Sequence, residues 1–485
     1  VYEQMIFYGD SKKSALDSSC LLSSLEQVAK RTNDERDTIM IRRFEGALFI
    51  AVLTVALAAF GTGTAFAAED EVPTFSKDVA PIFQAKCEAC HRPNSIAPMS
   101  LVTYQESRPW ARSIKDRVST RQMPPWHIDR TVGISEFKND RSLTDAEIDT
   151  VVRWVDGGAP RGNPADMPTA LEWPDQARWY LADRFGGPPD LIVESDPFTM
   201  PAEANDAWWK PISDTGLTEP RWVRAIEVRP GTEAGRKITH HVIARLEQDE
   251  TDPLLLNPNA TDDNDPLANS GLFMEWAVGK QGRVMRPGSG VLMLPDSRII
   301  WDVHYSASGE EITDTIKLGV YFYPKGEEPK NRQVLHLMGA TNGLDIEPNT
   351  IAVTQGFFPL KRAARIESFQ PHMHLRGKAM AIEAILPTGR REVLSHVGDF
   401  NFNWHNSYQY ADGAAPLLPK GTLMKVTAWH DNTIANRSNP DPNVWVGYGD
   451  RTVDEMAHAW VNVTYFTDEE YDSLVEARES ADNNN

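Results

Sequence analysis

The chain has 485 residues, which at about 150 residues per domain predicts about three domains. Apolar residues make up 41% and charged residues 24%, as in an ordinary soluble globular protein. The formal net charge of −20 argues against nucleic acid or an anionic membrane surface as a partner, because both attract cationic faces. The 14 Trp and 33 Pro do not fit a coiled coil, and three Cys do not make a disulfide scaffold.

Residues 40–67 have the three parts of a signal peptide. Arg42 and Arg43 form the positive region, and Gly46–Phe60 is an apolar run shorter than the about 20 residues of a membrane span. Ala65–Ala67 has the A-x-A form of a cleavage site. We therefore expect cleavage and export, to the periplasm where the cell has one. A retained membrane anchor is the alternative.

The segment before the signal, residues 1–39, is polar, whereas signal peptides begin at the N-terminus. We predict that this segment comes from a start site placed too early and that Met40 is the initiator. The mature chain then lacks Cys20, and after cleavage it has no stable membrane span.

The two remaining cysteines form the motif Cys87-Glu88-Ala89-Cys90-His91, whose C-x-x-C-H spacing attaches c-type haem. Two thiols on one helical turn reach both vinyl groups, and His91 then follows as the ligand to iron. A disulfide and a thioredoxin-like site are the alternatives, but neither requires the histidine. The motif predicts one covalent haem c.

The second axial ligand of the haem iron is predicted to be Met123, in Arg-Gln-Met-Pro-Pro-Trp. Proline after the methionine stiffens the loop that presents the thioether. Met99 and His127 are the alternatives.

A helix is predicted after residue 144, because apolar residues recur at helical spacing. Thr144 is its candidate N-cap and Gly157-Gly158 its stop. We expect it to pack on the haem-binding helix. With the haem motif, residues 68–165 resemble a class I cytochrome c, which implies a small all-α domain. Residues 166–189 are a linker rich in Pro, Gly and charge.

The larger part of the chain is predicted to be β. Short apolar strands alternate with turns and show no βαβ rhythm, which favours antiparallel sandwiches. We expect one sandwich over 190–345, a second over 346–470 and an acidic tail over 471–485. The clearest strands are predicted at 191–195, 221–228, 298–307, 316–323, 380–387, 422–429 and 458–466.

Histidines on these strands share faces with one another. His372 and His374 are two residues apart, so that both can bind one ion from one face of a strand. His304 follows the same alternation on an earlier strand. His240 and His241 are adjacent, and both can reach one site only from a bent strand or through different ring nitrogens.

The thioether of Met456 is a further candidate ligand, because a sulfur that joins imidazoles favours copper over zinc. The other histidines have weaker patterns. His405 and His430 are expected to hydrogen-bond backbone near their turns. His458 shares the face of Met456 and either lines a pocket with Trp460 or packs within the sheet.

In this order and spacing, the motifs resemble the copper type II, ascorbate-dependent monooxygenases, whose members are peptidylglycine α-hydroxylating monooxygenase and dopamine β-monooxygenase. The resemblance spans 190–467 and includes Leu375-Arg376-Gly377 and Asp454-Glu455-Met456. It implies two antiparallel, jelly-roll-like β-sandwich domains with one copper each. The implied ligands are His240, His241 and His304 for the electron-storing copper, and His372, His374 and Met456 for the catalytic copper that activates O₂.

The activity implied by the resemblance is a copper-dependent hydroxylation. One oxygen atom of O₂ enters a C–H bond of a small organic substrate, and two electrons and two protons turn the other into water. We expect the fused cytochrome, itself reduced by an upstream periplasmic donor, to feed single electrons to the coppers. Its tether raises the local donor concentration to roughly the millimolar range.

Two positions depart from the peptide-hydroxylating members of this family. Those members carry Arg where this chain has Gln370 and Tyr where it has Trp460, so a peptide ending in glycine is not the expected substrate. Oxidation at sulfur would use the same ligands. The alternative to an enzyme is a non-oxygenating copper-binding or electron-transfer protein with a cytochrome c domain.

Overall fold

The computed structural model describes residues 71–93, 95, 97–172, 179–249, 270–277, 282–340 and 343–482. The predicted upstream segment, the signal peptide and the end of the acidic tail lie outside the described residues. From Val72 onward the chain forms one compact unit. No helix in the stretches named above combines the length and the apolar character needed to cross a membrane.

Helices dominate the first part of this unit. Helix α6 begins at a capping box, in which Thr144 and Glu147 bond each other's backbone N–H, and it ends at Gly157. Its Trp154 packs on Phe75 and Phe83, with ring centroids 5.9 and 6.4 Å apart, as the sequence predicts. The elements are η1 (Phe75–Val79), α3 (Ala80–Lys86), α4 (Tyr104–Ser107), η2 (Arg108–Trp110), α5 (Ala111–Ser119), α6 (Asp145–Asp156), η3 (Pro164–Asp166) and α7 (Ala182–Phe185).

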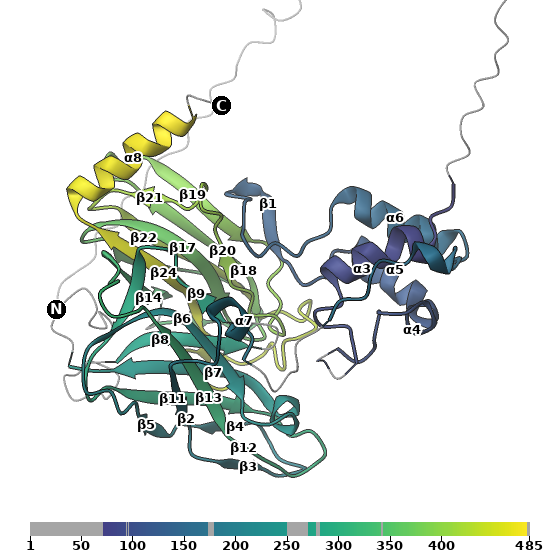
Figure 1. Ribbon diagram of the computed structural model, residues 1–485, viewed down its shortest axis with the longest axis horizontal. Helices are drawn as coiled ribbons and strands as arrows, with labels where there is room; N and C mark the ends of the chain where they lie inside the picture. The colour runs from purple at the N-terminus through teal and green to yellow at the C-terminus, as the bar shows by residue number, and fades with distance from the viewer. Residues whose placement is uncertain are drawn as a thin grey trace, which may run out of the picture. The chain divides into compact units, whose positions relative to one another are not determined.

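The rest of the chain is mostly β and forms several sheets, followed by the terminal helix α8 (Asp468–Asp482), yellow in Figure 1. All seven predicted strands are present. Among the described residues, one sheet has fifteen strands. These are β2 (Leu191–Glu194), β4 (Ala207–Trp209), β5 (Ile212–Asp214), β6 (Arg221–Pro230), β7 (Thr239–Glu247), β8 (Ser270–Ala277), β9 (Arg283–Val284), β10 (Ser289–Met293), β11 (Arg298–Tyr305), β13 (Ile316–Phe322), β14 (Asn331–Ala340), β17 (Ala363–His372), β20 (Tyr408–Gln409), β21 (Leu417–Leu418) and β24 (Ala457–Phe466).

In the part of the chain that the structure describes, a second sheet has five strands in the order β1-β19-β18-β22-β16, and two further sheets have two strands each. The five are β1 (Ile128–Gly133), β16 (Ile351–Pro359), β18 (Gly377–Ile385), β19 (Arg391–Val397) and β22 (Leu423–Asp431). The two-stranded sheets pair β3 (Phe198–Met200) with β12 (Ile312–Asp314) and β15 (Asp345–Ile346) with β23 (Val446–Gly447); the short helix η4 spans Ala234–Lys237.

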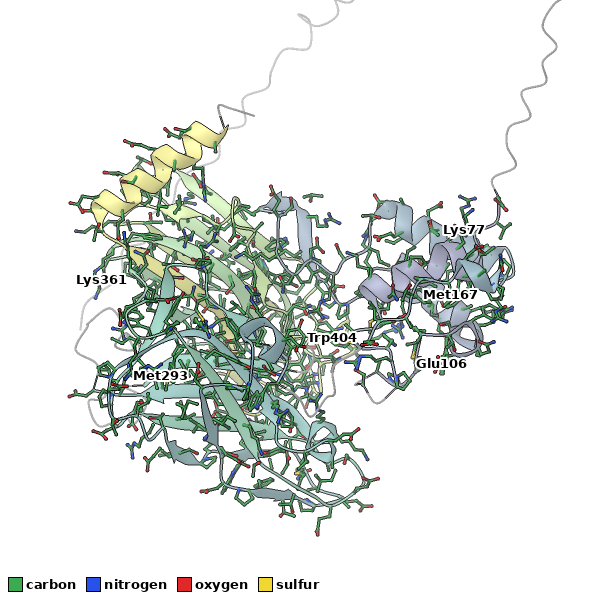
Figure 2. The ribbon with its side chains drawn as sticks, viewed as in Figure 1. Lys77, Glu106, Met167, Met293, Lys361 and Trp404 are labelled. Atoms are coloured by element: carbon green, nitrogen blue, oxygen red, sulfur yellow. The ribbon has the colours of Figure 1, made fainter. Side chains whose placement is uncertain are left out.

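Two large apolar cores lie among these strands. One is built from residues 193–322 and includes Trp301 and Met293; Met293 is labelled in Figure 2. The other is built mainly from residues 338–465 and includes Phe369 and Val461. Strand β14 connects the two regions, because it pairs with β10 of the first and with β24 of the second, and β24 in turn pairs with β17.

Part of the range predicted to be all-α belongs to the second of these cores. Strand β1 pairs with β19, and Trp126, Ile128 and Phe137 are buried in the core of residues 338–465. Trp126 packs edge-on against Tyr408 with ring centroids 4.7 Å apart. Apolar spacing marks these side chains as buried but does not say in which core.

Candidate metal centre

Three histidines from two neighbouring strands form one group. His240 and His241 come from β7, and His304 comes from β11. Each ring offers a nitrogen, and these nitrogens lie within 4.8 Å of one another. The group has the size and ligand type of a transition-metal site.

A β-bulge places the two adjacent histidines on one side of the strand. His304 pairs with His241, but the next residue, Tyr305, pairs with Thr239, so that His240 is the extra residue of β7. A bulge bends the strand and re-aims a side chain that would otherwise face the opposite surface. Of the two alternatives that the sequence left open, a bent strand or different ring nitrogens, the structure therefore has the bent strand.

The environment of these rings fits a metal. The Nδ1 atoms of His240, His241 and His304 are shielded from solvent and have no hydrogen-bond partner. His304 Nε2 lies 2.9 Å from Asp206 Oδ2, a carboxylate contact of the kind that orients metal-bound imidazoles. Burial and the neighbouring His304 lower the pKa of His240 to about 4. It is therefore neutral at pH 7, the form that binds metals.

His372 and His374 lie where β17 ends. Their ring centroids are 5.4 Å apart. His374 Nδ1 is 3.1 Å from the carbonyl oxygen of Asp454, an arrangement that leaves Nε2 for a metal. The first residues of the Asp-Glu-Met signature thus lie directly against the H-x-H segment.

Glu455 fixes that contact. Its carboxylate is fully buried and accepts the backbone N–H of His374 at 2.8 Å and of Arg376 at 2.5 Å. Met456 follows it and precedes β24, and its carbonyl oxygen lies 3.0 Å from His430 Nε2. Among the described contacts, none joins the Met456 sulfur to His372 or His374.

The two groups of histidines adjoin each other. The ring centroids of His241 and His372 are 6.5 Å apart. His405 lies beside both: its Nδ1 is 3.0 Å from His372 Nδ1, and its ring centroid is 6.3 Å from that of His241. Burial lowers its pKa to about 3. Sequence reasoning missed this role, because His405 is in a loop with no periodic pattern.

His458 and Trp460 cover the same side of His372. His458 pairs with His372 across the β17–β24 ladder and stacks on it, with centroids 4.9 Å apart. The Trp460 ring is 4.7 Å from that of His372. Gln370, opposite Trp460, is buried and its amide has no hydrogen-bond partner. His458 therefore packs within the sheet and also faces the candidate site.

The C-x-x-C-H motif follows α3. His91 N–H and Cys90 N–H both bond to the Cys87 carbonyl, which makes one tight turn. His91 Nδ1 lies 3.1 Å from the Met99 carbonyl oxygen, so that Nε2 remains for an axial bond to iron. Cys87 and Cys90 form no disulfide, and burial raises the pKa of the Cys87 thiol to about 12. The motif thus supplies two thiols and one ring nitrogen, the groups that the predicted haem c would use.

Met123 lies between α5 and β1 and is half-buried. Its backbone N–H bonds to the Arg117 carbonyl at 3.1 Å. Met99 bonds through its carbonyl to His91, and His127 donates its backbone N–H to the Tyr408 hydroxyl at 3.3 Å. The described contacts do not join any of these three side chains to the His91 ring, so Met123 stays a prediction.

A scan against protein-family models gives no match, and neither does a search of curated proteins. Among solved structures, the infectious bursal disease virus VP2 subviral particle is 12% identical and aligns over 62% of this chain and 76% of its own, with a TM-score of 0.16. Recombinant pro-11S globulin of pumpkin is 7% identical over 57% of this chain and 85% of its own, with a TM-score of 0.11. Likenesses this weak carry no argument about function.

Proposed function

We propose that this chain is an exported haem–copper monooxygenase of two antiparallel β-sandwich domains and a cytochrome c domain. The proposal is carried by one observation, the β-bulge that brings His240 and His241 to His304 with three unpartnered Nδ1 atoms. A strand distorted to gather three imidazoles favours a metal site over a sheet surface. The resemblance of the ligand motifs to the copper monooxygenases supports copper.

In this proposal the residues divide their tasks between two coppers. His240, His241 and His304 would hold the first copper, with Asp206 orienting the last. The second site uses His372, His374 and Met456, and Glu455 holds its two segments together. Bound copper would supply the one-electron chemistry that hydroxylation of a C–H bond with O₂ requires. Trp460 and Gln370 beside His372 are candidates to contact the substrate.

The helical part would supply the electrons. Cys87 and Cys90 would attach one haem c, and His91 and Met123 would hold its iron. An upstream periplasmic donor would reduce it. O₂ and a small organic molecule would be the other partners.

Metal content tests this proposal first. The chain would be expressed from Met40 with export and haem maturation, and copper would be counted per haem. We expect two coppers, falling to one in His372→Ala and in Met456→Ala. His396→Ala on β19 and Met167→Ala in the linker are matched controls that should keep two. No copper, or one copper insensitive to these changes, contradicts the proposal.

Oxygen uptake then separates the enzyme from its alternative. With an artificial reductant for the haem and a panel of small organic substrates, O₂ consumption should depend on substrate and be lost in His372→Ala. A protein that holds two coppers and one haem but consumes no O₂ with any substrate would instead be an electron-transfer or copper-binding protein.

A further inference from the structure

The segment that follows Met123 is fixed to the loop that precedes β20. Asn406 Nδ2 donates to the Pro125 carbonyl at 2.9 Å, and the Tyr408 hydroxyl accepts the His127 N–H at 3.3 Å. Trp404, labelled in Figure 2, belongs to the same loop. Pro125 is only two residues beyond the predicted haem ligand.

The same loop contacts the H-x-H segment through His405. The Nδ1 atoms of His405 and His372 are 3.0 Å apart, the length of an N–H···N hydrogen bond. A metal-bound imidazole uses its second nitrogen for a bond of this kind, which fixes the tautomer and leaves the other nitrogen for the metal. His405 is therefore the partner of His372, and Asn406 is its neighbour in the chain.

We propose that His405 and Asn406 form the link through which single electrons pass from the haem to the copper held by His372 and His374. This inference rests on the proposed function. It adds that electrons reach this site directly, without first passing through the group of His240, His241 and His304. Each transfer moves one electron, oxidising Fe(II) haem to Fe(III) and reducing one Cu(II) to Cu(I), with no bond made or broken.

The proposed electron path from Met123 to His372 consists only of covalent bonds and hydrogen bonds. From Met123 it follows the backbone to the Pro125 carbonyl, crosses one hydrogen bond to Asn406, follows the backbone to His405 and crosses a second to His372. Covalent and hydrogen-bonded routes carry electrons better than gaps of equal length. His241 offers a weaker continuation, since its ring contacts that of His405 at 6.3 Å with no hydrogen bond described between them.

Further contacts hold the segment after Met123 against the core of residues 338–465. Asn139 Nδ2 donates to the Ser407 carbonyl at 2.8 Å, and Ile134 N–H bonds to the Leu394 carbonyl at 2.8 Å. The segment after Met123 is thus anchored to residues 394–411, which belong to the core that contains β17. Any motion of the segment after Met123 would therefore move the predicted haem ligand Met123 and His405 together.

Transient kinetics on the holoprotein test the link. Haem would be reduced by a light pulse with both coppers oxidised and O₂ absent, and its reoxidation followed by absorbance. In His241→Ala, which keeps only the second copper, the fast reoxidation should persist. In His372→Ala, which keeps only the first, it should disappear. The reverse pattern overturns the inference while leaving the proposed function intact, because copper and haem are counted beforehand.

Variants of the link itself sharpen the test. His405→Phe and Asn406→Leu should slow haem reoxidation by about tenfold or more, measured in excess copper so that both sites are filled, and with the haem potential unchanged. His405→Gln, whose amide can still bond His372, should recover part of the rate. Asn403→Leu, an exposed change in the same loop, is the matched control. Wild-type rates in both His405→Phe and Asn406→Leu would overturn the inference, whereas failure to bind two coppers would instead remove the proposed function.

Discussion

The imidazole rings of His241 and His372 lie 6.5 Å apart, although the residues belong to different strands, β7 and β17. The two predicted copper sites are therefore neighbours within one sheet system. The ring of His405 contacts both His241 and His372, so the two predicted sites also have one neighbouring side chain in common.

This proximity predicts a magnetic interaction. Two Cu(II) ions bound by neighbouring rings should broaden each other's electron paramagnetic resonance signals. The spectra of His241→Ala and His372→Ala, each with one copper, are the controls. A two-copper spectrum equal to the sum of the two single-copper spectra would contradict the adjacency of the sites.

Asp206 contacts His304 Nε2 at 2.9 Å, and its removal should weaken the first of the two proposed copper sites alone. Asp206→Ala leaves His304 Nε2 without its carboxylate partner, so copper affinity there should fall about 10- to 100-fold. Competition with a chelator measures this loss. Asp214→Ala, an exposed change on β5, should have no effect, and the copper bound by His372 should be retained in both variants.

Glu455 should determine stability as well as metal binding. Glu455→Gln leaves one of the two backbone N–H groups, that of His374 or of Arg376, facing an amide N–H₂ instead of an oxygen. We expect the free energy of unfolding to fall by about 2 kcal/mol, together with loss of copper from the second site. Denaturant unfolding followed by circular dichroism checks the first effect. Glu392→Gln on β19 is the control, and a variant as stable as the wild type would refute the role given to Glu455.

His336 should make stability fall in acid. Burial lowers its pKa from 6.5 to about 4, and the Tyr465 hydroxyl lies 2.8 Å from its Nε2. The unfolded chain takes up a proton more readily, so the full contribution is present above about pH 6.5 and is lost as pH falls towards 4. Between about pH 7.5 and 5 the wild type should lose about 2 kcal/mol more than His336→Leu. Equal losses in the two proteins would contradict burial of a neutral ring.

Much of the secondary structure follows from local pattern. Period-two alternation predicted the strands that carry His304 and His372, because each strand faces a core on at least one side. The N-cap at Thr144 was predicted for a similar reason, because an N-cap and the residues it bonds lie within one turn; its reciprocal bond with Glu147 appears in the structure.

The adjacent histidines suggested a bent strand as one of two alternatives, but the sequence could not show where the bulge lies. Its position depends on the register of β7 against β11, which is set by pairing between strands some 60 residues apart. The two histidines alone conflict with strand periodicity. That conflict was the only local sign of a functional distortion.

The role of His405 had no local sign at all. Loops lack a period, and the hydrogen bond to His372 arises only when β17 and the loop meet in the folded chain. The same limit applies to Trp126 and Phe137, whose apolar character predicts burial but not the core of residues 338–465 as its place.

The pairing of β14 with β24 also governs how the molecule can be divided. Residues Gln333–Ala340 of β14 are matched one to one with Thr464–Ala457 of β24. Dividing the chain at the predicted boundary near residue 345 would leave each half with an unpaired strand edge. The free N–H and C=O groups of such an edge readily pair with a strand of another chain. Two halves produced together should therefore copurify as a non-covalent pair, whereas either half alone should aggregate.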